Sequence, residues 1–172
     1  MNLPNKLTIG RIICTPVFVL LYALDLYIPA FVVFLAASLT DLLDGRIARK
    51  YGIVTNFGKI MDPLADKILV YSAFCMFIDK GLMPGWMLII ILAREFAVSG
   101  MRLIAVEKGR VIAAGWSGKV KTASTMVCIC LMIVFGAEPR WLNLACQIII
   151  LATTVYSGVE YFIKNWDVFQ EK

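Results

Sequence analysis

The sequence predicts an all-α integral membrane protein, a bundle of six transmembrane helices with a short amphipathic segment at the N-terminus. Its 172 residues are 60% hydrophobic and only 17% charged, whereas soluble domains average roughly 45–50% and 25%. Apolar runs recur at regular intervals, and basic residues cluster between alternate pairs of these runs. We therefore expect a single membrane domain over residues 1–172.

Each expected helix follows from an apolar run and the break after it. The basic opening MNLPNKLTIGR precedes a first apolar run, Ile12–Leu24. A second helix is expected from near Ile28 into an aspartate-rich stretch, and a third from that stretch through Ile68–Ile78. A fourth is expected from Trp86, a fifth over about Thr122–Phe135, and a sixth that contains the uncharged run Trp141–Val159. Turns are expected at Lys80–Gly85 and Gly136–Pro139. Crossing a bilayer takes about 20 helical residues, so the shorter runs need polar ends that project into the cytoplasm or an internal cavity.

Positive charge sets the expected orientation. With both termini in the cytoplasm, only Lys80 and Arg140 fall outside, and the other 15 of the 17 Lys and Arg residues fall inside. The expected location is the inner (cytoplasmic) membrane, crossed several times. The aspartate-rich stretch then faces the cytoplasm. The chain contains no histidine, and its five cysteines lie in apolar runs without a CxxC pair. Histidine catalysis, a disulfide framework and a structural zinc site are thereby disfavoured.

Four aspartates between two apolar segments form the candidate site. Asp41 and Asp44 are three residues apart, and Asp62 and Asp66 are four apart, so each pair shares a face if it is helical. Gly52 and its neighbours allow the two helices to turn back on one another. Converging carboxylates would suit two Mg²⁺ or Mn²⁺ ions and phosphoryl chemistry. The alternative is a set of surface-loop aspartates balanced by nearby Lys and Arg.

Neighbouring residues fit a phosphate site. Gly45 and Gly58 lie near the aspartate faces, where a missing side chain admits a bulky phosphate, although small residues also serve helix packing. Arg49 is two turns from Asp41 and offers a guanidinium fork, unless it only reaches the membrane surface. Pro63 is expected to start or kink the third helix.

The spacing D-x-x-D-G-x-x-A-R, eight residues, then G-x-x-x-D-x-x-x-D resembles the signature of the CDP-alcohol phosphotransferase family. The matching residues are Asp41, Asp44, Gly45, Ala48, Arg49, Gly58, Asp62 and Asp66. The resemblance implies a six-helix fold and a two-metal centre held by Asp41, Asp44 and Asp62 and bordered by Asp66. It also makes Asp66 the general base that takes a proton from the attacking alcohol, and it suggests a homodimer. Gly45, Ala48, Arg49 and Gly58 would line the CDP pyrophosphate cradle.

The opening segment has one further pattern. Asn5, Thr8 and Arg11 recur every three residues and could share a helix face. Helix capping with headgroup contact and a substrate role both remain open. On the resemblance, Asn5 and Thr8 join the candidate pyrophosphate site.

The second half carries a basic group around the fourth-to-fifth connection, composed of Arg94, Arg102, Arg110, Lys119 and Lys121. An ordinary positive rim would look similar, but charges within an apolar helix more often line a cavity. AREFAVSGMR (Ala93–Arg102) and WSGKVKT (Trp116–Thr122) resemble stretches of phosphatidylglycerophosphate synthases. The implied donor is CDP-diacylglycerol and the implied acceptor is sn-glycerol 3-phosphate, with Arg94, Arg102, Arg110 and Lys119 around the acceptor phosphate. Glu95 would orient an arginine or form a simple intrahelical ion pair.

The expected activity is thus transfer of a phosphatidyl group by direct displacement, which releases CMP. Membrane lipids are expected partners, and a nucleic acid is not. A sibling enzyme would use another acceptor, such as inositol phosphate, serine or phosphatidylglycerol. A small cation carrier is the alternative from another class, but carriers place their site near mid-membrane between two related halves, and the sequence shows no such repeat.

Overall fold

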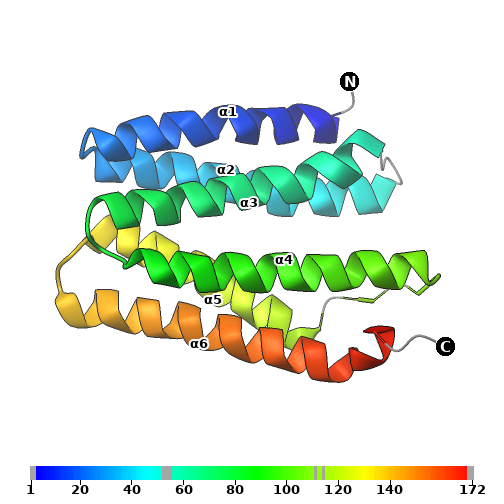
Figure 1. Cartoon of the computed structure of the whole chain (residues 1–172). Helices are drawn as coiled ribbons and strands as arrows, with labels where there is room; N and C mark the ends of the chain where they lie inside the picture. The colour runs from blue at the N-terminus through cyan, green and yellow to red at the C-terminus, as the bar shows by residue number, and fades with distance from the viewer. Residues whose placement is uncertain (1–2, 52–55, 111, 114, 170–172) are drawn as a thin grey trace. The chain divides into compact units, whose positions relative to one another are not determined.

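The computed structural model describes residues 3–51, 56–110, 112–113 and 115–169, and for residues 3–8, 41–51, 56–60, 62–63 and 169 the backbone alone. Within these ranges every regular element is helical, as predicted (Figure 1). The elements are α1 (Leu3–Ala23), α2 (Tyr27–Tyr51), α3 (Asn56–Asp79), α4 (Gly85–Glu107), α5 (Trp116–Phe135), α6 (Arg140–Lys164) and the 3₁₀ helix η1 (Trp166–Phe169). The chain divides into two compact units, Met1–Gly81 and Leu82–Lys172.

In the first unit, α1 packs against both α2 and α3. Phe18 and Tyr22 are four residues apart, so their rings share one face of α1, and both are fully buried. The ring centroid of Phe18 lies 5.5 Å from that of Phe34 on α2, and the centroid of Tyr22 lies 5.8 Å from that of Phe77 on α3. These tilted and edge-on contacts are favourable ring geometries. The first helix therefore holds together the two helices that carry the aspartates.

A polar contact joins the α1–α2 connection to the end of α3. Asp25 has a φ of 61°, in the left-handed region. Its Oδ1 accepts a hydrogen bond from the Tyr27 hydroxyl at 2.7 Å and lies 2.5 Å from the Lys80 Nζ. The hydrogen bond from Lys80, and then that from Tyr27, lower the pKa of the Asp25 carboxyl. The Asp25–Lys80 ion pair therefore links the α1–α2 connection to the residue that follows α3.

In the second unit, α6 packs against both α4 and α5. The buried residues of α5 and α6 recur at helical spacing, as in Cys128 with Met132 and Cys146 with Ile150. Polar side chains of α6 donate hydrogen bonds to backbone carbonyl groups in the segments that connect the helices. The Asn143 amide donates to the Gly136 carbonyl oxygen at 3.1 Å, and the Gln147 amide donates to the Leu82 carbonyl oxygen at 2.8 Å. Such satisfaction of backbone groups is required where water is scarce.

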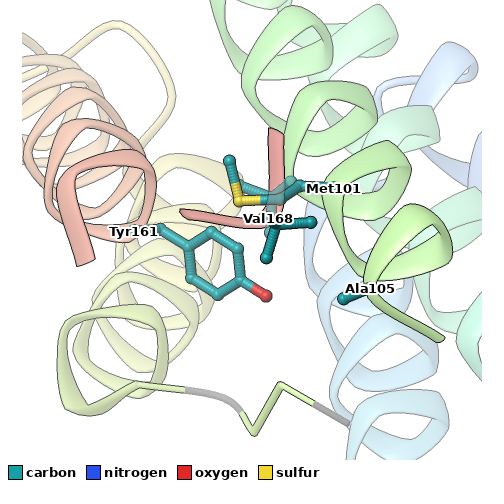
Figure 2. Packing of buried hydrophobic residues seen from close by; sticks show 5 residues of the cluster. Met101, Ala105, Tyr161 and Val168 are labelled. Carbon is teal, nitrogen blue, oxygen red and sulfur yellow. The ribbon is translucent and has the colours of Figure 1, made fainter. Parts of the chain in front are cut away.

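A hydrophobic cluster lies where the chain turns back after α6. Val98, Met101 and Ala105 of α4 pack with Tyr161 of α6 and Val168 of η1. Figure 2 shows the Tyr161 ring and the Val168 side chain directed toward Met101 and Ala105. The C-terminal turn therefore belongs to the packed interior of this unit.

Among the described residues, α5 and α6 are the two helices long and apolar enough to cross a membrane by length and composition. The apolar parts of α1 and α2, Ile9–Ala23 and Tyr27–Thr40, are shorter. At 1.5 Å per residue, these parts fall short of the roughly 30 Å hydrocarbon core. The prediction that some helices need their polar ends is therefore consistent with the element lengths.

The opening segment leads directly into the first helix, as expected, since α1 begins at Leu3. One predicted boundary was wrong: α5 begins at Trp116 instead of Thr122. Helix α6 contains the uncharged run Trp141–Val159 and continues beyond it to Lys164. Lysine and glutamate are good helix formers, so the helices extend past their apolar runs. Helix α3 begins at Asn56, so Pro63 does not start it. The turn expected around Gly52 lies outside the described residues.

Candidate functional site

Both aspartate pairs lie on helices, as predicted. Asp41 and Asp44 lie in the second half of α2, and Asp62 and Asp66 lie in the first half of α3. Spacings of three and four residues put each pair on one face of its helix. The two helices contact one another, and both pack on α1. The topology therefore brings the two pairs into one unit of the protein.

Most motif side chains lie outside the described part of the structure. These residues are Asp41, Asp44, Gly45, Ala48, Arg49, Gly58 and Asp62, together with Asn5 and Thr8 on α1. Asp66 is described and is half-buried, next to the fully packed Ala65. Among described side chains there is no cluster of three or more His, Cys, Asp or Glu that could hold a metal ion. The side chains of Asp41, Asp44 and Asp62 lie outside the described part of the structure, so the metal centre stays a prediction.

Arg11 is a buried cation that lies close to the aspartate motif. Its side chain is 1% exposed. Its Nε donates to the carbonyl oxygen of Ala37 at 3.3 Å, and Ala37 lies one helical turn before Asp41 on α2. The sequence grouped Arg11 with Asn5 and Thr8, but it was not placed among the site residues. A buried guanidinium is costly unless it is paired, and an arginine within an apolar helix was the signal for it.

In the second unit, two cations share one carboxylate. Glu95 Oε1 lies 2.9 Å from Arg94 Nη1 and 2.6 Å from Lys121 Nζ. The three side chains are 14%, 13% and 12% exposed, respectively. Lys121 comes from α5, so Glu95 both contacts the neighbouring arginine and joins two helices. The three residues together carry one net positive charge, and Lys121 was missing from the predicted acceptor set.

Arg94 also approaches α6 closely. A Cβ atom on Gly158 would stand 3.0 Å from Arg94 Cγ, tighter than ordinary side-chain contacts. Glycine inside a helix lowers stability by up to about 1 kcal/mol relative to alanine. The close packing of Arg94 explains why a glycine stands at position 158 in spite of this cost. Arg94 also lines a cavity of about 760 Å³ between α4 and α6, whose walls are otherwise formed by apolar residues such as Ala97, Val155 and Phe162. A cavity of this composition suits hydrocarbon.

The other predicted acceptor residues have partners of their own. Arg102 Nε donates to the Tyr161 hydroxyl at 3.0 Å, and its guanidinium carbon lies 5.4 Å from the centroid of that ring. Arg110 forms an ion pair with Asp167 at the surface. Lys119 is exposed in the first turn of α5. The three arginines thus have three different partners, and a common phosphate site for them stays a prediction.

Comparison with known proteins gives a consistent result. The family model described as CDP-alcohol phosphatidyltransferase matches residues 1–158. The chain is 36% identical to a CDP-diacylglycerol–glycerol-3-phosphate 3-phosphatidyltransferase of Bacillus subtilis strain 168, over 98% of this chain and 97% of that protein. It is 38% identical to a protein of the same name from Rickettsia typhi, over 94% and 95%. It is 37% identical to a probable phosphatidylglycerophosphate synthase of Mycobacterium tuberculosis H37Rv, over 93% and 79%.

Proposed function

The chain belongs to the CDP-alcohol phosphatidyltransferase family, and on that premise we propose that it makes phosphatidylglycerol phosphate. It transfers the phosphatidyl group of CDP-diacylglycerol to sn-glycerol 3-phosphate and releases CMP. The observation that carries this function is the similarity to enzymes named for that reaction, which extends over nearly the full length of both chains. The family model also crosses the boundary between the two units, which supports one functional domain over residues 1–172.

The donor set of the motif fits divalent metal ions. Asp41, Asp44, Asp62 and Asp66 offer carboxylate oxygens, the ligands that Mg²⁺ and Mn²⁺ prefer, and their backbones lie on two contacting helices. We assign Asp41, Asp44 and Asp62 as ligands, with Asp66 at the border of the centre. When bound, two such ions would neutralise charge on the pyrophosphate and on the departing CMP.

The chain's own residues then position the donor and handle the proton. Asp66 takes the proton of the acceptor hydroxyl as the hydroxyl oxygen forms its bond to the phosphatidyl phosphorus. The bond from that phosphorus to the bridging pyrophosphate oxygen breaks, and CMP leaves with the bridging oxygen. The half-buried position of Asp66 supports this role, because the carboxylate remains within reach of a substrate. No covalent enzyme intermediate is required.

The remaining motif residues form the donor cradle. Gly45, Ala48 and Gly58 are small and admit the pyrophosphate close to α2 and α3. Arg49 supplies a planar guanidinium fork to a phosphate. Asn5 and Thr8 lie on α1, which packs against both motif helices, and they are assigned to the same cradle.

The acceptor site is assigned to the second unit. Arg110 and Lys119 lie at the α4–α5 connection with accessible charges, so they are the cations best able to receive a phosphate. Arg94 and Arg102 complete the predicted set. Arg94 is held by Glu95, and Arg102 is held by Tyr161. These contacts support the assignment of both arginines to the α4 side of the acceptor site. Lys121 joins them through the same carboxylate.

The location follows from the apolar helices and the distribution of charge. The two long apolar helices and the family support a membrane protein. We assign six spans with both termini and the site on the cytoplasmic side, as the Lys and Arg distribution predicts. A homodimer in the lipid bilayer is part of the same proposal.

The function is tested with purified protein in lipid–detergent micelles. CDP-diacylglycerol is supplied with glycerol 3-phosphate, inositol phosphate, serine or phosphatidylglycerol, and CMP release is measured with Mg²⁺, with Mn²⁺ and with a chelator. Release that requires glycerol 3-phosphate and a divalent ion is expected. Release with another acceptor alone would assign the chain to a sibling activity.

A further inference from the structure

The C-terminal turn is fastened to the end of α4. Val168 is 4% exposed in the cluster with Met101, Ala105 and Tyr161 (Figure 2). The Lys108 ammonium donates to the Val168 carbonyl oxygen at 2.8 Å. Burial of the side chain and a hydrogen bond to the backbone thus fix this residue. Asp167, the preceding residue, is therefore held at a defined place on the surface.

Arg110 is held just as firmly from the other side. Helix α4 ends at Glu107, and Gly109 follows with a φ of 72°. The Gly109 N–H donates to the Val106 carbonyl oxygen at 2.9 Å, and the Arg110 N–H donates to the Ala105 carbonyl oxygen at 2.8 Å. These two bonds form a Schellman motif, which ends the helix and sets the direction of the next residue. The backbones on both sides of the ion pair are therefore preset.

The ion pair itself is exposed and exchangeable. The Arg110 and Asp167 side chains are 49% and 56% exposed. Pairs of this kind are weak because water and salt screen them. Asp167 also lies beyond the residues that the family model matches.

From these contacts we propose that Asp167 sets the affinity for the acceptor, because it competes with the acceptor's phosphate for Arg110. The inference rests on the proposed function, in which Arg110 receives that phosphate. A carboxylate and a phosphate present similar oxygen pairs to a guanidinium. Without acceptor, Asp167 neutralises Arg110. When the acceptor binds, its phosphate takes over the guanidinium, while the carboxylate, fixed by Val168, remains nearby as a repelling charge.

The direction in which the KM for glycerol 3-phosphate changes distinguishes an Asp167 that competes with the phosphate from an Asp167 that orients Arg110. If Asp167 competes, its neutralisation lowers the KM for glycerol 3-phosphate. If it only orients Arg110 toward the phosphate, neutralisation raises that KM. Because the pair is exposed, the expected decrease is about two- to fivefold. The KM for CDP-diacylglycerol does not depend on this pair, so it is expected to stay the same.

The experiment compares full-length wild type with Asp167→Asn, at saturating CDP-diacylglycerol and varied glycerol 3-phosphate. The expected result is a lower KM for glycerol 3-phosphate, a kcat close to that of wild type, and a matching gain in competitive inhibition by inorganic phosphate. Asp167→Ser is measured in parallel, so that a defect peculiar to one substitution does not decide the result. An unchanged or raised KM in both variants overturns the inference.

Two further variants make the result specific. In an Arg110→Ala background, Asp167→Asn is expected to leave the KM unchanged, since the competed group is gone; an equal decrease there would mean general charge repulsion and would contradict the inference. Glu138→Gln removes a carboxylate from another exposed pair, with Arg140, and is expected to have no effect. A wild type that releases no CMP with glycerol 3-phosphate overturns the proposed function and this inference with it.

Discussion

Lys121 Nζ of α5 lies 2.6 Å from Glu95 Oε1 of α4, and the same oxygen lies 2.9 Å from Arg94 Nη1. One carboxylate therefore joins two helices and balances one of two buried cations. Charges at such depth are costly when a partner is missing. Substitutions of Glu95 and Lys121 should therefore lower the stability of the second unit by different amounts.

Glu95→Gln should be more damaging than Lys121→Met. The first change leaves two buried cations side by side, whereas the second leaves the Arg94–Glu95 pair intact. Breaking a fully buried pair costs about 3–5 kcal/mol; because these side chains are 12–14% exposed, a smaller loss is expected, which thermal unfolding in detergent would report as a lower Tm. Glu138→Gln, in a highly exposed pair, serves as the control without effect. Equal losses for the two buried variants would show that the carboxylate does not hold the group together.

Gly158→Ala should displace Arg94. The added Cβ would meet Arg94 Cγ at 3.0 Å, while a Cβ on Gly100 of α4 meets nothing within 4 Å. Gly100→Ala is thus the matched control and should stabilise the protein by up to about 1 kcal/mol through helix propensity. Gly158→Ala should lower both Tm and the rate of CMP release, and its effect should shrink when Arg94 is itself changed to alanine. A Gly158→Ala protein as stable as the Gly100→Ala protein would refute this account of the close approach.

The Asp25–Lys80 contact should stabilise the fold over a defined pH window. The hydrogen bond from Lys80 lowers the pKa of Asp25 below its ordinary value of 3.8, and the same bond raises the pKa of Lys80 above 10.5. The Asp25 contribution is therefore present above pH 3.8 and is lost as the pH falls through the lowered pKa. The Lys80 contribution is present below pH 10.5 and is lost as the pH rises through the raised pKa.

The measurement is the difference in Tm between wild type and Asp25→Asn across this range. The difference should be positive at neutral pH, should shrink as the pH falls below 3.8, and should vanish once the pH is below the lowered pKa of Asp25. A Tm difference that is constant through acid pH would mean that the contact does not depend on the ionised carboxylate.

Asp66→Asn should abolish turnover while CDP-diacylglycerol binding persists. Loss of a general base typically costs 10²–10⁴-fold in rate, and the amide keeps the size of the side chain. Binding of the donor is measured by calorimetry in the presence of Mg²⁺, beside the CMP-release assay. Loss of donor binding together with turnover would instead make Asp66 part of the metal-holding scaffold.

The sequence was sufficient to predict that the four aspartates lie on two helices. Fixed spacings of three and four residues between carboxylates have a direct meaning once the segment is helical, and α2 and α3 are helices over those positions. The ends of helices were less predictable, because α5 and α6 continue through charged residues that a hydropathy pattern excludes.

The sequence did not predict which side chains pair with one another, because these contacts depend on how the helices cross. The contact of Lys121 with Glu95 joins residues 26 positions apart on different helices. Asp167 reaches Arg110 only because the chain turns back after α6 and buries Val168. Arg11 shared its spacing with Asn5 and Thr8, but its burial against Ala37 follows from the packing of α1 on α2.

The central claim is most directly tested by measuring CMP release from CDP-diacylglycerol by the purified protein with Mg²⁺, before and after addition of sn-glycerol 3-phosphate. We predict release that depends on this acceptor and the formation of phosphatidylglycerol phosphate in equal amount. Equal release with and without glycerol 3-phosphate, or with serine or inositol phosphate in its place, would contradict the proposed function.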